Sequence, residues 1–181
     1  MQPKRPYLDS SVYIAAIKGP NSNEPAGRAD LARHILQEAE RGTYRVTAST
    51  WIAVEVHKRG KGPVQSDDDL ALIDAYLQQG YIDWVELDFL LAMDARRLAR
   101  QHSLSPADSV HLATAIKSGC DELLRWDGPW PLGNYEGVEV REPYWFGQQT
   151  LPIAPVSGTI STSTSPSTPA ESLSQPPPPS E

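Results

Sequence analysis

The segment Tyr7-Leu8-Asp9-Ser10-Ser11-Val12-Tyr13-Ile14 predicts a short strand that passes into a helix through an acidic residue. Tyr7-Leu8 supplies the apolar run of the strand, and the apolar residues from Val12 to Ile17 recur at helical spacing. Ser10 and Ser11 are residue types that cap a helix N-terminus through a side-chain oxygen, and Asp9 is another. The segment therefore places an acid at the end of a strand, at the start of a helix.

Short apolar runs and longer amphipathic stretches go on alternating along the chain, which is typical of an α/β domain with a mainly parallel sheet. We expect a central sheet flanked by helices on both faces, in three layers. The expected helices cover residues 30–41, 50–58, 67–77 and 89–102, and a further helix begins at Ser105-Pro106 and ends at Gly119. The expected strands cover residues 44–47, 82–87, 123–124 and 138–140, with the last at an edge of the sheet.

The composition changes near Gln149. Residues 150–181 are dominated by Ser, Thr and Pro, include four consecutive prolines at 176–179, and contain no aromatic residue, Lys or Arg. Such a stretch cannot bury enough apolar surface to offset the entropy lost on ordering. We therefore expect one folded domain over residues 1–149 and a disordered tail over residues 150–181.

The bulk composition excludes several classes of protein. Sixteen Lys and Arg against 23 Asp and Glu give a net charge of −7, which argues against adhesion to nucleic acid through a broadly basic surface. The sequence has no apolar run long enough to span a membrane, and residues 1–6 do not begin a secretory signal, so we expect a cytoplasmic protein. The single cysteine, Cys120, cannot form an internal disulfide, and we expect it to be buried or half-buried.

Four acids stand out by their positions. Asp9 and Asp127 each follow a short apolar strand, and ligands of open α/β sheets bind beyond the carboxyl ends of strands. Glu55 and Asp108 lie on helices that the same topology can bring to that rim. Carboxylates that converge need a compensating charge, which Mg²⁺ or Mn²⁺ would supply, since these ions take oxygen ligands. The corresponding chemistry is metal-assisted phosphodiester hydrolysis.

Each acid also has a purely structural interpretation. Ser105 and Asp108 have the spacing of a capping box, and Asp9 can be an N-cap. Glu55 can be a salt-bridged acid at a helix edge, and Asp127 can open the turn Asp127-Gly128-Pro129. The occurrence of the four acids in four separate segments favours a shared site.

These segments resemble the four motifs of the PIN domain family, and in particular its VapC-type toxins. The similar stretches, in the family's order, are Tyr7–Ile14, Thr47–Glu55, Leu104–Ala115 and Leu123–Trp130, within residues 6–142. The resemblance implies a PIN-like fold and a ribonuclease in which Asp9, Glu55, Asp108 and Asp127 ligate Mg²⁺ or Mn²⁺. It also implies a homodimer and a cognate antitoxin protein that fills the site. Arg125 departs from the pattern, because the family commonly has Thr or Ser there; the arginine can pair with Asp127 or with phosphate.

Several other residues have two interpretations each. Ser10 and Ser11 can support a metal-bound water or cap the helix. His111 can be a general base, but we favour a half-buried packing role. Lys58, Arg59 and Lys61 can contact RNA or form a solvated helix end. The remaining candidates are Arg96, Arg97 and Arg100, which we expect to form a solvated face, and Trp126 and Trp130, which can stack bases or pack in the core.

Two rival functions stay open. One is a catalytically inactive PIN-fold module that binds RNA or acts as a scaffold, with the proline run of the tail recruiting partners. The other is a phosphotransferase with an aspartate nucleophile after the first strand. Enzymes of the second kind typically have another Asp two residues later, where this chain has Ser11. The sequence therefore favours a metal-dependent ribonuclease.

Overall fold

The computed structural model describes residues 4–18, 25–56, 67–126 and 128–146, without the side chains of residues 67–69. The predicted tail, residues 150–181, lies outside the described residues. Twelve elements occur in these ranges. The strands are β1 (Pro6–Leu8), β2 (Val46–Ser49), β3 (Ile82–Val85), β4 (Glu122–Leu124), β5 (Gly133–Tyr135) and β6 (Val138–Arg141). The helices are α1 (Ser10–Ile17), α2 (Arg28–Glu40), α3 (Trp51–Glu55), α4 (Asp67–Leu77), α5 (Phe89–His102) and α6 (Pro106–Lys117).

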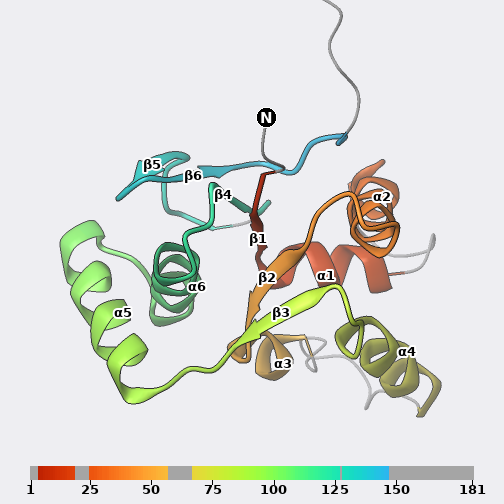
Figure 1. Ribbon diagram of the computed structural model, residues 1–181, viewed down its shortest axis with the longest axis horizontal. Helices are drawn as coiled ribbons and strands as arrows, with labels where there is room; N and C mark the ends of the chain where they lie inside the picture. The colour runs from red at the N-terminus through yellow and green to blue at the C-terminus, as the bar shows by residue number, and fades with distance from the viewer. Residues whose placement is uncertain (1–3, 19–24, 57–66, 127, 147–181) are drawn as a thin grey trace, which may run out of the picture. The chain divides into compact units, whose positions relative to one another are not determined.

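The strands form one sheet in the order β3-β2-β1-β4-β6-β5, in which every pair is parallel except β5 with β6. Helices α5 and α6 pack together on one face, and α1 packs with α2 and α4 on the other (Figure 1). The prediction of a three-layer α/β domain with a mainly parallel sheet is confirmed. Burial on both faces explains why the residues of β1, β2 and β4 are all buried.

The central strands bring distant segments to one rim. Tyr7 of β1 is in register with Thr47 of β2 and with Leu123 of β4. Because the three strands are parallel, their carboxyl ends lie at the same edge of the sheet. Asp9 follows β1 at this edge, and α3, which ends at Glu55, starts two residues after β2.

The helix ends explain where α1 and α6 begin. Asp9 is the N-cap of α1, and its carboxylate accepts a hydrogen bond from the backbone N–H of Ser11. The interpretation of Ser10 and Ser11 as the caps is therefore wrong, since both residues lie inside the helix. Ser105 caps α6, and Pro106 occupies its first turn, as the sequence predicts.

The predicted edge strand is misplaced. β6 lies between β4 and β5, and β5 is at the edge, paired antiparallel to β6 through the turn at Glu136 and Gly137. Both turn residues have positive φ, 50° and 96°, as a tight hairpin requires. The second strand also lies two residues later than expected, at Val46–Ser49.

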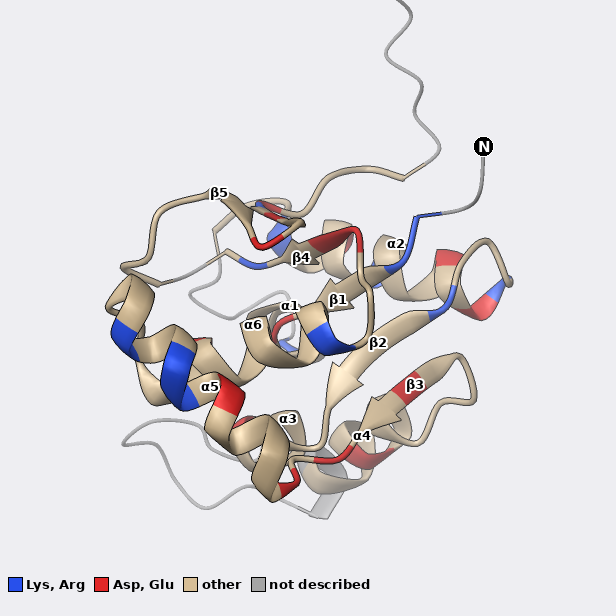
Figure 2. Cartoon of the chain, turned by 60° about the vertical axis from the view of Figure 1, so that its left-hand side comes forward, with Lys and Arg blue, Asp and Glu red and all other residues tan. Residues whose placement is uncertain are grey.

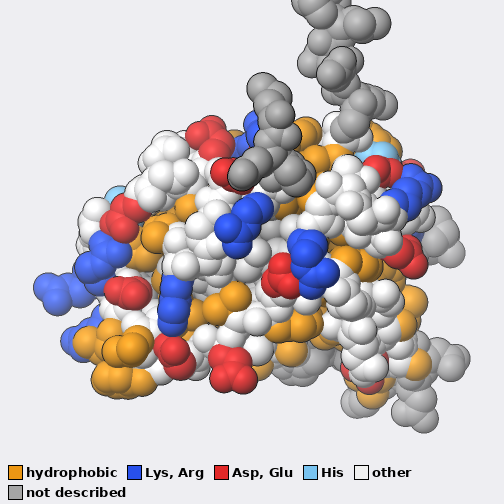
Figure 3. Space-filling view, in the orientation of Figure 1, with side chains coloured by type: hydrophobic (Ala, Val, Ile, Leu, Met, Phe, Trp, Pro, Cys, Tyr) orange, Lys and Arg blue, Asp and Glu red, His pale blue; other side chains and the backbone are white. Residues whose placement is uncertain are grey.

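The next features are the burial of the single cysteine, the character of the helices and the distribution of charged side chains. Cys120 is buried, as expected. In the part of the chain that the structure describes, no helix has the length and apolarity needed to cross a bilayer. The basic residues of α5 lie toward its carboxyl end, and its one acid, Asp94, precedes them (Figure 2). On the face drawn in Figure 3, acidic and basic side chains are interspersed.

Candidate functional site

Two carboxylates converge on one imidazole at the carboxyl end of β1. Nε2 of His111 lies 2.8 Å from Oε2 of Glu55 and 3.2 Å from Oδ1 of Asp9. The three side chains come from α6, α3 and the β1–α1 junction. Since only 2% of the His111 side chain is exposed, the contacts lie in a poorly solvated place, where charges interact strongly.

The far side of the imidazole ring is also fixed. Nδ1 of His111 lies 2.8 Å from the hydroxyl of the buried Tyr7, and this hydroxyl accepts a hydrogen bond from the backbone N–H of Ser49. The arrangement suits a ring that donates from Nε2 to the carboxylates and contacts the tyrosine through Nδ1. The Tyr7 hydroxyl therefore orients the His111 ring, and this ring contacts the carboxylates of Asp9 and Glu55.

The charges in this cluster stabilise one another. Burial lowers the pKa of His111, but the attractions of Asp9 and Glu55 outweigh it and raise the pKa above its usual value. Burial raises the pKa of Glu55, but hydrogen bonds with His111 and Ser10 outweigh it and lower the pKa overall. The negative charge of Glu55 and the positive charge of His111 thus favour each other.

The serines of α1 connect the acids to the rest of the rim. The Ser10 side chain hydrogen-bonds to Glu55. The Ser11 hydroxyl accepts a hydrogen bond from the backbone N–H of Trp126, which ties α1 to the segment that follows β4. Both serines therefore support neighbouring parts of the site, in place of the capping role that the sequence left open.

Asp108 occupies the first turn of α6. Its backbone N–H donates to the Ser105 hydroxyl at 3.1 Å, and the hydroxyl donates to Oδ2 of Asp108 at 2.6 Å. The serine cap is thus present as the capping interpretation expected, and it also orients the carboxylate. The cap and the site are compatible, because Asp108 still lines the same pocket as Asp9.

The pocket has a volume of about 460 Å³ and an acidic lining. Its titratable lining residues are Asp9, Glu55, Asp108, His111 and Lys18. Within the described ranges, no group of three or more His, Cys, Asp or Glu side chains is close enough to hold a metal ion. The donors nevertheless fit Mg²⁺ or Mn²⁺ in kind, because such ions need one or two carboxylates, with water and substrate phosphate supplying the other ligands.

Asp127, the fourth acid, and the basic residues Lys58, Arg59 and Lys61 lie outside the described residues. Three of the four predicted acids are therefore brought to one pocket, and the position of the fourth stays a prediction.

Other candidates take structural roles. Trp130 packs in the core with 5% exposure, and Trp126 is half-buried with the Arg28 guanidinium over its ring. Arg96, Arg97 and Arg100 are exposed on α5, as expected of a solvated face, and Arg97 pairs with Glu136. Arg125 is buried with 4% exposure, which leaves little surface for the phosphate contact that the sequence left open.

The packing interpretation of His111 was incomplete. The ring is buried, as packing requires, but both of its nitrogens contact polar groups of other segments. One signal in the sequence favoured a site role: His111 lies three residues after Asp108, so both lie on one side of the same helix. The hydroxyl of Tyr7 left no comparable signal.

Comparisons with known proteins identify the family and one similar fold. Residues 7–127 match the PIN domain family. VapC20 of Mycobacterium tuberculosis, a toxin that cleaves the sarcin-ricin loop, has a similar fold, with a TM-score of 0.52 and 17% identity over 68% of this chain and 90% of VapC20. VapBC2 of Rickettsia felis, solved with a DNA fragment from its promoter, aligns with a TM-score of 0.49 and 14% identity over 76% of this chain and 97% of that chain. No curated protein sequence matches the chain.

Proposed function

The chain belongs to the PIN domain family, and on that basis we propose that it is a metal-dependent endoribonuclease and the toxin of a type II toxin–antitoxin pair. The observation that carries the proposal is the convergence of Asp9 and Glu55 on Nε2 of His111, in a pocket that Asp108 also lines. Carboxylates from three separate segments lie at this rim. A purely structural network would not need an acidic pocket open to a ligand.

The proposed roles follow from the contacts. Asp9, Glu55 and Asp108, with Asp127 as the fourth acid, would ligate Mg²⁺ or Mn²⁺. A bound ion of this kind lowers the pKa of a coordinated water and offsets the charge that develops on the scissile phosphate. His111 orients Asp9 and Glu55 and is itself oriented by Tyr7. Ser10 and Ser105 fix the carboxylates of Glu55 and Asp108.

The direct test is cleavage of a small-RNA pool with Mg²⁺ or Mn²⁺, with and without a chelator. The informative variants are Asp9→Asn, Glu55→Gln and Asp108→Asn. Asparagine can still cap α1 at position 9, so that variant removes the charge and keeps the helix start. The matched control is Asp94→Asn, which removes a carboxylate from α5 at an exposed position outside the pocket.

We expect discrete metal-dependent products from the wild type and from Asp94→Asn, and their loss in the three site variants. If the wild type binds RNA but cleaves no better than the site variants, the inactive RNA-binding or scaffold function takes precedence. If the chelator leaves cleavage unchanged, the protein is a nuclease that does not depend on a metal ion.

Lys58, Arg59 and Lys61 are the proposed contacts to the RNA backbone, since they follow Glu55 closely in the chain. Replacing all three with Ser should weaken RNA binding and flatten its dependence on salt, because each phosphate contact releases counterions. Replacing Arg96, Arg97 and Arg100 on α5 with Ser is the matched control, because it removes the same number of positive charges. If the salt dependence of RNA binding is unchanged in the triple variant, these residues do not contact the RNA backbone.

The proposed partners are a cognate antitoxin and a second copy of the chain, both implied by the resemblance to VapC-type toxins. VapC20 cleaves the sarcin-ricin loop, but at 17% identity that target is not transferred to this chain. Expression of the wild type in a bacterial host should arrest growth, and Asp9→Asn should not. Light scattering of the purified chain tests the homodimer.

A further inference from the structure

Arg125 is a buried cation behind the acidic pocket. It directly follows β4 and is 4% exposed. Its Nη2 donates to the backbone carbonyl of Trp130, and its guanidinium carbon lies 4.8 Å from the centroid of the Trp130 ring. The backbone carbonyl and the aromatic ring of one residue therefore hold the guanidinium in a single orientation.

Gly128 separates this cation from the pocket. It lines the pocket together with Asp108, and its φ of 133° lies in the region that favours glycine. A Cβ at this position would overlap with Nη1 of Arg125 and would lie 3.7 Å from Oδ1 of Asp108. The guanidinium and the Asp108 carboxylate thus approach the same small volume from two sides.

The positive charge of Arg125 affects the carboxylates that line the pocket. A cation in a poorly solvated place acts on nearby carboxylates with little screening, because few water molecules and salt ions intervene. It therefore eases the mutual repulsion of the pocket acids when they hold no ligand, and it opposes the arrival of another cation. Two buried groups can compensate the acids in this way: His111, which lies between Asp9 and Glu55 in the pocket, and Arg125, which lies behind Asp108 outside the pocket lining.

We infer that Arg125 is a positioning residue that acts as a fixed counter-charge to Asp108 and weakens the binding of divalent cations in the pocket. The inference rests on the proposed function only in treating the pocket as a metal site. An arginine suits this role better than a lysine, because its planar group stacks on Trp130 while it donates to the carbonyl.

The test measures binding of Mn²⁺ alone to the full chain by calorimetry, without RNA. Arg125→Met and Arg125→Gln remove the charge, and the glutamine keeps an N–H donor for the Trp130 carbonyl. Arg125→Lys keeps the charge but lacks the planar guanidinium group. Arg97→Met is the matched control, since it removes an exposed arginine from α5 and changes the net charge by the same amount.

We expect the Met and Gln variants to bind Mn²⁺ at least about tenfold more tightly than the wild type, and the Lys variant and Arg97→Met to stay within about threefold. Circular dichroism checks folding, and the increase in melting temperature with saturating Mn²⁺ is a second readout for any variant of low stability. Equal or weaker Mn²⁺ binding in both neutral variants, or no binding by any variant, would overturn the inference. The RNA cleavage assay with Asp9→Asn and Asp108→Asn judges the proposed function separately.

Discussion

Nε2 of His111 lies 2.8 Å from Oε2 of Glu55, so a buried imidazole from α6 holds a carboxylate from α3. Burial opposes a charge on both groups, but the attraction of Asp9 and Glu55 raises the pKa of His111, and the contact with His111 lowers the pKa of Glu55. The pair therefore couples the stability of the domain to pH.

The first prediction concerns this pH dependence in a metal-free buffer with chelator. The raised pKa of His111 adds stability that is complete below its usual value of 6.5 and is lost as pH rises through the folded-state pKa. The lowered pKa of Glu55 adds stability that is complete above its usual value of 4.5 and is lost as pH falls. In urea unfolding, the free energy of unfolding of the wild type should therefore exceed that of His111→Gln most between pH 4.5 and 6.5, and the difference should shrink toward pH 9. A difference independent of pH would refute the coupling.

The second prediction separates two buried tyrosines. Tyr7→Phe leaves Nδ1 of His111 and the N–H of Ser49 without this partner, so it should cost about 1–3 kcal/mol of unfolding free energy and should slow RNA cleavage. Tyr13→Phe is the control, because the buried hydroxyl of Tyr13 has no hydrogen-bond partner among the described residues. That change should leave stability and cleavage unchanged. Thermal melts and cleavage rates measure both effects, and equal losses in the two variants would contradict the role assigned to Tyr7.

Much of the fold could be predicted because its signals are local. α5 has the predicted bounds, since Leu91, Ala95 and Leu98 recur at helical spacing. β5 was missed because Gly133–Tyr135 is three residues long with one apolar side chain, too short to show a period. Without β5, the neighbouring β6 was assigned to the edge of the sheet.

The site could be predicted only in part, because it depends on contacts between segments. Asp9, Glu55 and Asp108 were found from their positions after strands and on helices. The partners of His111 come from β1, α3 and the β1–α1 junction, which the spacing along α6 does not reveal. The burial of Arg125 likewise depends on Trp130 in a loop whose path the sequence does not give.

The third prediction uses two helix caps. Ser105→Ala removes the cap of α6 and the hydrogen bond to the Asp108 carboxylate. It should therefore lower the free energy of unfolding by about 1 kcal/mol and also reduce RNA cleavage. Asp88 caps α5, because its carboxylate accepts a hydrogen bond from the backbone N–H of Leu91 at 2.7 Å. Asp88→Ala removes this cap and should lower the free energy of unfolding by a similar amount. Because Asp88 does not line the pocket, cleavage measured well below the melting temperature should be unchanged in that variant. If both variants lost cleavage in proportion to stability, Ser105 would have no role beyond the cap.

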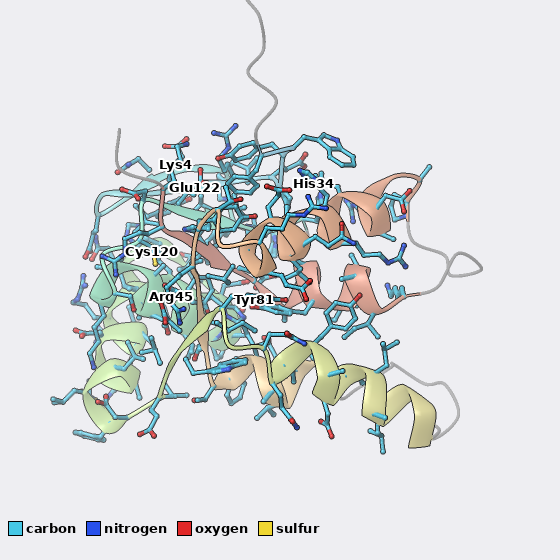
Figure 4. The ribbon with its side chains drawn as sticks, turned by 45° about the vertical axis from the view of Figure 1, so that its right-hand side comes forward. Lys4, His34, Arg45, Tyr81, Cys120 and Glu122 are labelled. Carbon is cyan, nitrogen blue, oxygen red and sulfur yellow. The ribbon has the colours of Figure 1, made fainter. Side chains whose placement is uncertain are left out.

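The fourth prediction tests whether a buried acid matters for cleavage when it lies away from the pocket. Glu122 is 1% exposed at the amino end of β4, beside Lys4 (Figure 4). It accepts hydrogen bonds from Lys4 at 3.1 Å and from Tyr144 at 2.7 Å. Glu122→Gln keeps a partner for Tyr144 but loses the charge that attracts Lys4, so it should lower the free energy of unfolding by about 1–2 kcal/mol. Glu122 is in register with Pro6, three residues before Asp9, so cleavage by the folded variant should equal that of the wild type.

Comparing Glu122→Gln with Asp9→Asn at equal folded fractions separates stability from chemistry. Urea titration gives the folded fraction, and cleavage is then measured per folded molecule. Loss of cleavage in Asp9→Asn alone would assign the effect to the pocket. Similar losses in both variants would mean that removing any buried carboxylate of this domain impairs cleavage, and the assignment of Asp9 to the site would fail.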